Sequence, residues 1–167
     1  IFDGPEEILK KTEFTQPAIY IVSTIIGYLL IDKGLKPDAL AGHSLGEYSA
    51  LTIGGAFDFS TGLKLVKIRS ESMAEAGKIN KGTMAAIVGL KDNDVKQICS
   101  SYDGIGTLVT ANFNSPGQVV ISGSPEAIQW AMTNSKNNGA RMAVELNVSG
   151  AFHSPLMSPA RENLAEM

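Results

Sequence analysis

The pentapeptide Gly42-His43-Ser44-Leu45-Gly46 has the G-x-S-x-G spacing of a nucleophile turn. It follows a short apolar run, residues 39–42, and precedes residues 45–53, which have helical spacing. On such a sharp strand-to-helix turn the Ser44 hydroxyl can attack a carbonyl carbon, and side chains in place of the flanking glycines are expected to clash. The N–H of Leu45, at the positive end of the helix, is expected to stabilise the oxyanion. The alternative is a glycine-rich turn that Ser44 merely caps.

A serine hydroxyl needs a neighbouring base, and histidine is the usual one because its pKa lies near neutrality. The sequence has two histidines, His43 and His153. His43 is adjacent to Ser44 on the same tight turn, so its ring is not expected to aim at the hydroxyl. His153 lies in a loop of small residues and is the favoured base. A surface loop histidine is the alternative for His153, and a packing role is expected for His43.

Two different portions of chain are expected to position these groups. Residues 1–79 and 148–167 read as a larger α/β portion that holds the strand–turn–helix of Ser44. Residues 80–147 have the order β-α-β-β-α-β of a ferredoxin-like unit. Its predicted strands are residues 84–88, 107–112, 118–122 and 141–146, and its predicted helices are residues 92–102 and 125–138.

Composition excludes several classes of function. Hydrophobic residues make up 44% of the 167 residues and charged residues 19%, with a formal net charge of −3, so no basic nucleic-acid surface is expected. A single cysteine, Cys99, allows no internal disulfide, and with two histidines it cannot form an ordinary structural zinc site. Residues 18–31 are too short and too mixed for a membrane span and are expected to form a buried helix. A cytoplasmic setting without metal or membrane is expected.

The segment Gly42–Leu51 resembles the active-site segment of malonyl-CoA:acyl-carrier-protein transacylases and of the acyltransferase domains of fatty-acid and polyketide synthases. Three further segments match this family in the same order: Thr15–Ala18, Asn112–Gly123 and Gly150–Met157. The resemblance covers essentially the whole chain. It implies a hydrolase-like parallel-sheet core with an inserted ferredoxin-like subdomain.

The resemblance also assigns roles to single residues. His153 falls on the catalytic position of the family, and Arg69 falls on the position of the arginine that binds the malonyl carboxylate. A guanidinium suits this task because it is always charged and can bind both carboxylate oxygens. Spacing alone favours a different reading of Arg69, a surface residue paired with Glu71 or Glu75.

Three further residues receive expected roles in substrate binding. An aromatic side chain at Phe152 goes with malonyl in this family, because the ring fills the space that an α-methyl group would need; simple packing is the alternative. Gln16 matches a family glutamine near the site and is expected to form a hydrogen bond there, with helix capping as the alternative. Asn114 is expected to line the cleft between the two subdomains.

The implied reaction is malonyl transfer from coenzyme A to the phosphopantetheine thiol of acyl carrier protein, through an ester on Ser44, in fatty acid or polyketide synthesis. The chain itself is expected to bind no cofactor and to be a monomer as a stand-alone enzyme. The alternatives are a serine esterase or thioesterase, or a non-catalytic binding module. The family's opening Gly-Gln-Gly-Ser-Gln loop and its histidine-orienting C-terminal segment are not found in these 167 residues. Little transferase activity is therefore expected of this piece alone.

Overall fold

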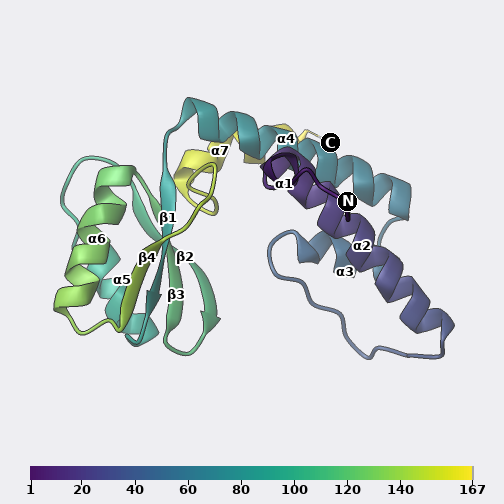
Figure 1. The fold of residues 1–167 in the computed structure, drawn as a ribbon, viewed down its shortest axis with the longest axis horizontal. Coiled ribbons are helices and arrows are strands. Elements are labelled where there is room, and N and C mark those ends of the chain that lie inside the picture. The colour runs from purple at the N-terminus through teal and green to yellow at the C-terminus, as the bar shows by residue number, and fades with distance from the viewer. Residues whose placement is uncertain (167) are drawn as a thin grey trace. The chain divides into compact units, whose positions relative to one another are not determined.

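The computed structural model describes residues 1–166 and divides into two compact units. The first unit contains Ile1–Ser72 with Glu166, and the second contains Met73–Ala165 (Figure 1). The helix α4, Phe59–Ile79, contributes residues to both units. The small subdomain expected at residues 80–147 lies inside the second unit, and its boundaries remain predictions.

The first unit is helical in its described residues. It contains α1 (Glu6–Leu9), α2 (Thr12–Asp32), α3 (Gly46–Ile53) and the first part of α4. The helix α2 begins at Thr12 and carries Pro17 in its interior. A proline has no N–H to donate to the carbonyl four residues before it, here that of Glu13. The hydroxyl of Ser70, from α4, lies 3.5 Å from that carbonyl oxygen.

A small core holds these helices of the first unit together. Tyr20 from α2, Leu45 at the start of α3 and Val66 from α4 are buried against one another. The Tyr20 hydroxyl lies 2.8 Å from the Thr52 hydroxyl oxygen and donates to the Phe59 carbonyl at 3.1 Å. Because Leu45 is part of this core, the turn that carries Ser44 is fixed against α2 and α4.

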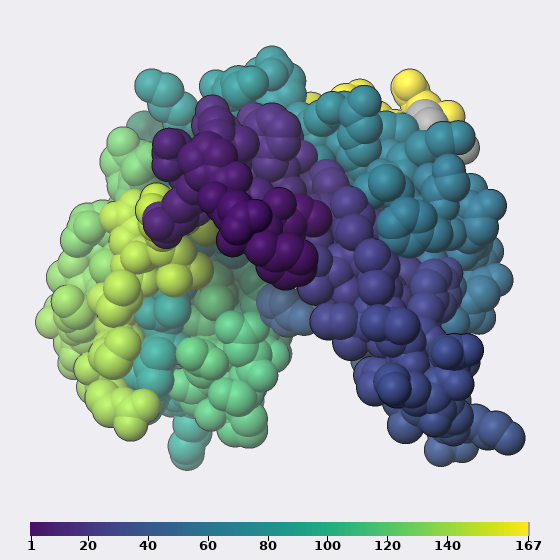
Figure 2. Space-filling model, turned by 45° about the vertical axis from the view of Figure 1, so that its right-hand side comes forward, coloured from purple at the N-terminus to yellow at the C-terminus, as the bar shows by residue number. Residues whose placement is uncertain are grey.

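The helix α2 is only partly buried, in contrast to the buried helix expected at residues 18–31. Its buried positions recur every four residues, at Thr12, Gln16, Tyr20 and Thr24. Several isoleucines and leucines on its other faces are about half exposed, and Figure 2 shows much of α2, in purple to indigo, at the surface. By length and composition α2 is apolar enough to cross a bilayer, but the core helix of a soluble protein passes the same test.

The strand predicted at residues 39–42 is also not formed. These residues have no regular structure, and an open cavity of about 700 Å³ lies between them and α3. A strand needs neighbouring strands to pair its N–H and C=O groups. Among the described residues of the first unit there is no strand, so the apolar run has nothing to pair with.

The second unit is built on one antiparallel sheet, in agreement with the predicted element order. It contains β1 (Thr83–Val88), α5 (Asp92–Ser100), β2 (Leu108–Ser115), β3 (Gln118–Gly123), α6 (Pro125–Asn137) and β4 (Met142–Glu145). The strand order is β2-β3-β1-β4, and every neighbouring pair is antiparallel. The chain then forms a short 3-10 helix, Pro155–Met157, and α7, Ser158–Ala165.

Alternating apolar side chains of the strands form the core of this unit. Ala85 and Ile87 of β1 and Val119 and Ile121 of β3 are fully buried and share one face of the sheet. The helices α5 and α6 cover that face (Figure 1). This rigid sheet carries the loop of residues 146–154, which leads from β4 to the 3-10 helix and includes His153.

Candidate active site

Ser44 occupies the strained turn that the sequence predicts. Its φ of 54° lies in the left-handed region, which is uncommon for a residue other than glycine. A Cβ at Gly42 would lie 1.9 Å from the Gly46 carbonyl carbon, so only glycine fits at position 42. A Cβ at Gly46 would meet nothing within 4 Å, so the expected clash is confirmed for Gly42 and wrong for Gly46.

The backbone after Ser44 presents a helix N-terminus. The N–H groups of Gly46, Glu47 and Tyr48 donate to the carbonyls three residues before them, at 3.0, 3.2 and 3.0 Å. Within the described part of the chain, the N–H of Leu45 makes no such backbone bond. The Leu45 N–H, directly after Ser44, is therefore not used by the backbone bonds that open α3.

Arg69 reaches Ser44 from α4. Its Nη2 donates a hydrogen bond to Ser44 Oγ at 2.9 Å, and its Nη1 donates to Gln16 Oε1. Both Arg69 and Gln16 are more than nine-tenths buried. Burial lowers the pKa of Arg69, while the nearby Tyr48 and Glu47 side chains oppose that change. An arginine remains charged in proteins, so a cation lies beside the serine hydroxyl.

The surface pairing that spacing favoured for Arg69 is not formed. Glu71 faces Lys67 at 3.9 Å, and Glu75 faces Lys78 at 3.4 Å, both on the exposed side of α4. Helix capping by Gln16 is also excluded, since α2 begins at Thr12 and Gln16 lies beyond its first turn.

Tyr48 is a member of this cluster that sequence reasoning missed. The Arg69 guanidinium carbon lies 5.7 Å from the centroid of the Tyr48 ring, within the range of a cation–π contact. Ser44 lies before α3 and has a left-handed φ, so helical spacing does not relate its side chain to that of Tyr48. The sequence therefore carried no local signal for this contact.

In the second unit, His153 lies in a loop with an unusual backbone. Its φ of 59° is again in the left-handed region, and its side chain is exposed. The next residue anchors the loop, because the Ser154 hydroxyl donates to the Ala151 carbonyl at 2.7 Å and accepts from the Leu156 N–H at 3.2 Å. The Asn80 side chain donates to the Leu156 carbonyl at 2.9 Å.

Phe152 is half-buried and packs on its own small core. That core consists of Met73, Ala76, Met157 and Ala160. This packing restrains the Phe152 ring, which directly precedes His153 in the chain. The contact fits the packing role and is equally compatible with a rigid steric wall.

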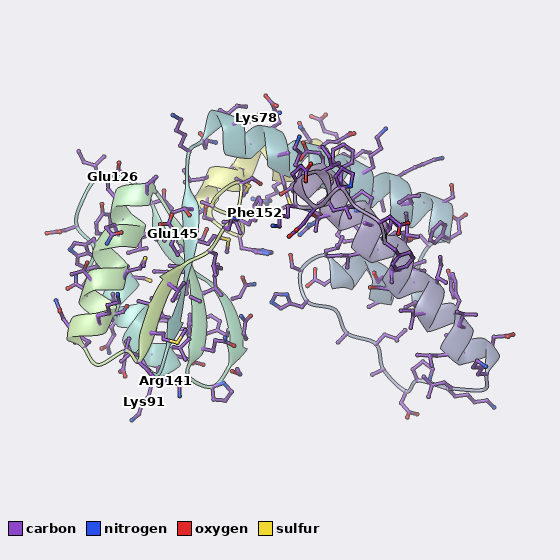
Figure 3. The ribbon with its side chains drawn as sticks, in the orientation of Figure 1. Lys78, Lys91, Glu126, Arg141, Glu145 and Phe152 are labelled. Atoms are coloured by element: carbon purple, nitrogen blue, oxygen red, sulfur yellow. The ribbon has the colours of Figure 1, made fainter. Side chains whose placement is uncertain are left out.

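Asn114 is exposed and lies away from the His153 loop within the second unit. A Cβ at Gly82, just before β1, would meet Ala151, so the loop lies at the Thr83 end of β1. Asn114 lies near the Val88 end, and the five residue steps between these ends of β1 span roughly 17 Å. Figure 3 shows the same separation, with Phe152 at one end of the sheet and Arg141 and Lys91 at the other.

No cluster of three or more metal-ligating side chains occurs among residues 1–166. Of the predicted site residues, Ser44, Gln16 and Arg69 are hydrogen-bonded together in the first unit. His153 and Phe152 belong to the second unit.

Residues 1–167 match the family described as "Acyl transferase domain" along their whole length. The chain belongs to the acyl transferase domain family. It is 44% identical over 168 residues to the malonyl CoA-acyl carrier protein transacylase of Bacillus subtilis, covering 100% of this chain and 53% of that protein. It is 47% identical to a polyketide-biosynthesis transacylase, BaeC, of Bacillus velezensis, covering 96% of this chain and 55% of that protein. The chain spans about half the length of the curated relatives it matches.

Solved structures agree with this membership. The malonyl CoA-acyl carrier protein transacylase of Coxiella burnetii matches with a TM-score of 0.94 and 41% identity, over 98% of this chain and 52% of that chain. A malonyl-transacylase described in complex with a type II polyketide acyl-carrier protein matches with a TM-score of 0.92 and 42% identity, over 98% of this chain and 53% of that chain. The α/β fold expected from sequence is confirmed at this level.

Proposed function

We propose that this chain provides the acyl-carrying part of an acyl-carrier-protein S-malonyltransferase. The observation that carries the proposal is the buried Arg69, which donates to the Ser44 hydroxyl at 2.9 Å. A cation beside a strained nucleophilic serine suits an acyl group with a carboxylate at its far end. Relatives named as malonyl transacylases at 44–47% identity support the same substrate.

In the proposed first step, His153 takes the proton from Ser44, and the serine oxygen attacks the thioester carbonyl of malonyl-CoA. The Leu45 N–H donates to the oxyanion that develops. The tetrahedral intermediate collapses, the carbon–sulfur bond breaks, and the imidazolium of His153 returns its proton to the departing coenzyme A thiolate. The malonyl group is then an ester on Ser44.

Arg69 changes partners in this scheme. The guanidinium has N–H donors beyond those that bind Gln16 and Ser44, and they can bind the malonyl carboxylate. In the second step His153 removes the proton from the phosphopantetheine thiol of the carrier protein. The thiolate attacks the ester carbonyl, and the proton passes to Ser44 as the ester bond breaks. No metal takes part, and the prosthetic group belongs to the partner.

The remaining assignments belong to the same proposal. We infer that the β-α-β-β-α-β unit is a ferredoxin-like subdomain inserted into a hydrolase-like parallel-sheet fold. Phe152 serves as the wall that excludes an α-methyl group. Asn114 meets only a part of the substrate remote from the His153 loop, given its place on the sheet. The enzyme is a cytoplasmic monomer of fatty acid or polyketide synthesis.

Malonyl transfer to a carrier protein tests the function. The full-length protein is incubated with malonyl-CoA and phosphopantetheinylated carrier protein, and malonyl-carrier protein and free malonate are both quantified. Transfer in excess of hydrolysis, lost in Ser44→Ala and in His153→Ala, is the expected result. Hydrolysis without transfer would identify a thioesterase. If neither product forms, a non-catalytic binding module is the remaining alternative. A Lys67→Ala variant serves as a control, since Lys67 lies on the exposed side of α4.

A further inference from the structure

The Tyr48 ring makes a third contact with Arg69, in addition to the two hydrogen bonds of the guanidinium. The bonds to Gln16 and Ser44 fix the guanidinium at two N–H groups, within its own plane. The Tyr48 ring lies 5.7 Å from the guanidinium carbon. Tyr48 is itself half-buried against Tyr20, Leu45 and Val66, so its ring is held in place by the core of the first unit.

We propose that Tyr48 is a positioning residue for Arg69, which its ring holds in the orientation that receives a carboxylate. The inference rests on the proposed function, in which Arg69 binds the malonyl carboxylate. A cation–π contact depends on the ring rather than on the phenol hydroxyl. The contact is also stronger where water is excluded, and Arg69 is more than nine-tenths buried.

The contact matters most once the malonyl group is in the site. In the free protein the Ser44 hydroxyl is one of two hydrogen-bond acceptors that hold Arg69. When malonyl-CoA binds, the guanidinium turns from that acceptor to the carboxylate. Gln16 and the Tyr48 ring are then the groups that still restrain it. Tyr48 therefore bears on substrates that have a carboxylate, and leaves an acetyl group unaffected.

The first experiment compares malonyl-CoA and acetyl-CoA as donors for the full-length enzyme. We expect Tyr48→Leu to raise KM for malonyl-CoA by about threefold to thirtyfold, the range between an exposed and a desolvated cation–π contact, with kcat and acetyl transfer nearly unchanged. Tyr48→Phe keeps the ring and is expected to behave like the natural protein. Phe59→Leu is the matched control, since Phe59 packs in the same core and stacks on Tyr20.

A second readout needs no turnover. It follows the side-chain Nε–Hε NMR signal of Arg69 in the ¹⁵N-labelled full-length protein. The signal of Arg69 is assigned by its loss in Arg69→Lys. We expect this signal to show a ring-current shift that Tyr48→Leu abolishes and Tyr48→Phe retains.

The outcomes separate the two proposals. Equal losses for malonyl and acetyl donors in Tyr48→Leu, or no rescue by Tyr48→Phe, would overturn the positioning role. An Arg69→Ala variant that keeps its preference for malonyl would instead overturn the carboxylate role of Arg69, and with it the basis of this inference. If Tyr48→Leu does not fold, Tyr48→Phe and the NMR shift of the unaltered chain still decide, because an Arg69 signal without a ring-current shift contradicts the contact.

Discussion

Replacing Arg69 with alanine removes the cation beside Ser44, and the structure indicates how much transfer activity this should cost. In the free protein Arg69 makes two hydrogen bonds, to Ser44 and to Gln16. In the proposed reaction, the bond to Ser44 is exchanged for bonds to the malonyl carboxylate, so the net gain is about one charge-assisted hydrogen bond. Such a bond contributes about 1.5–3 kcal/mol.

We therefore expect Arg69→Ala to lower kcat/KM for malonyl-CoA by about a hundredfold, which corresponds to the upper end of that range. Acetyl-CoA has no carboxylate, so its kcat/KM should change by less than about threefold, or less than about 0.7 kcal/mol. The same change leaves the buried Gln16 oxygen without its donor, which costs about 1–3 kcal/mol of folding stability.

The assay is steady-state transfer to carrier protein with each donor, and thermal unfolding measures stability. Lys67→Ala, on the exposed side of the same helix, is the control and should change neither quantity. A loss in Arg69→Ala that is equal for malonyl and acetyl donors would refute the reasoning, because it would show that Arg69 acts on Ser44 or on folding alone.

Three further predictions concern the fold that holds the site. Gly42→Ala should strongly destabilise the first unit in thermal unfolding, since its Cβ would lie 1.9 Å from a backbone carbon, whereas Gly46→Ala should fold normally. Tyr20→Phe should lower the free energy of unfolding by about 1–2 kcal/mol, because the hydroxyl of Thr52 loses its buried partner at 2.8 Å; chemical denaturation measures this. Burial raises the pKa of the Cys99 thiol to about 11, so alkylation at pH 8 should be slow in the folded protein and fast once denaturant exposes the thiol; equal rates would contradict that burial.

The nucleophile turn could be predicted from the sequence because its geometry is local. Two glycines around a serine, between an apolar run and a helical pattern, require a sharp bend, and the positive φ of Ser44 confirms it. The sheet of the second unit was predictable for the same reason, since alternating apolar residues and turn residues mark each strand.

The orientation of Arg69 could not be predicted from spacing, because it depends on how three helices pack. On α4, Glu71 and Glu75 lie two and six residues after Arg69 and so point in other directions, but this spacing does not show which neighbouring helix Arg69 faces. Its direction toward Ser44 follows from the burial of Tyr20, Leu45 and Val66 against one another. The contact of Tyr48 with Arg69 could not be predicted for the same reason, because it joins α3 to α4.

The strand at residues 39–42 shows the opposite error, in which a local pattern was taken to suffice. An apolar run becomes a strand only when neighbouring strands accept its hydrogen bonds, and the first unit has none among its described residues. Similarly, the apolar pattern of α2 predicted burial, but the apolar faces that the core does not reach remain exposed.

The most direct test is to find where the acyl group is attached. The full-length protein is incubated with malonyl-CoA, quenched in acid and digested, and the modified residue is located by tandem mass spectrometry. We expect a malonyl ester on Ser44 that is absent from Ser44→Ala and reduced in Arg69→Ala. A malonyl group on another residue, or coenzyme A release without any ester on Ser44, would contradict it.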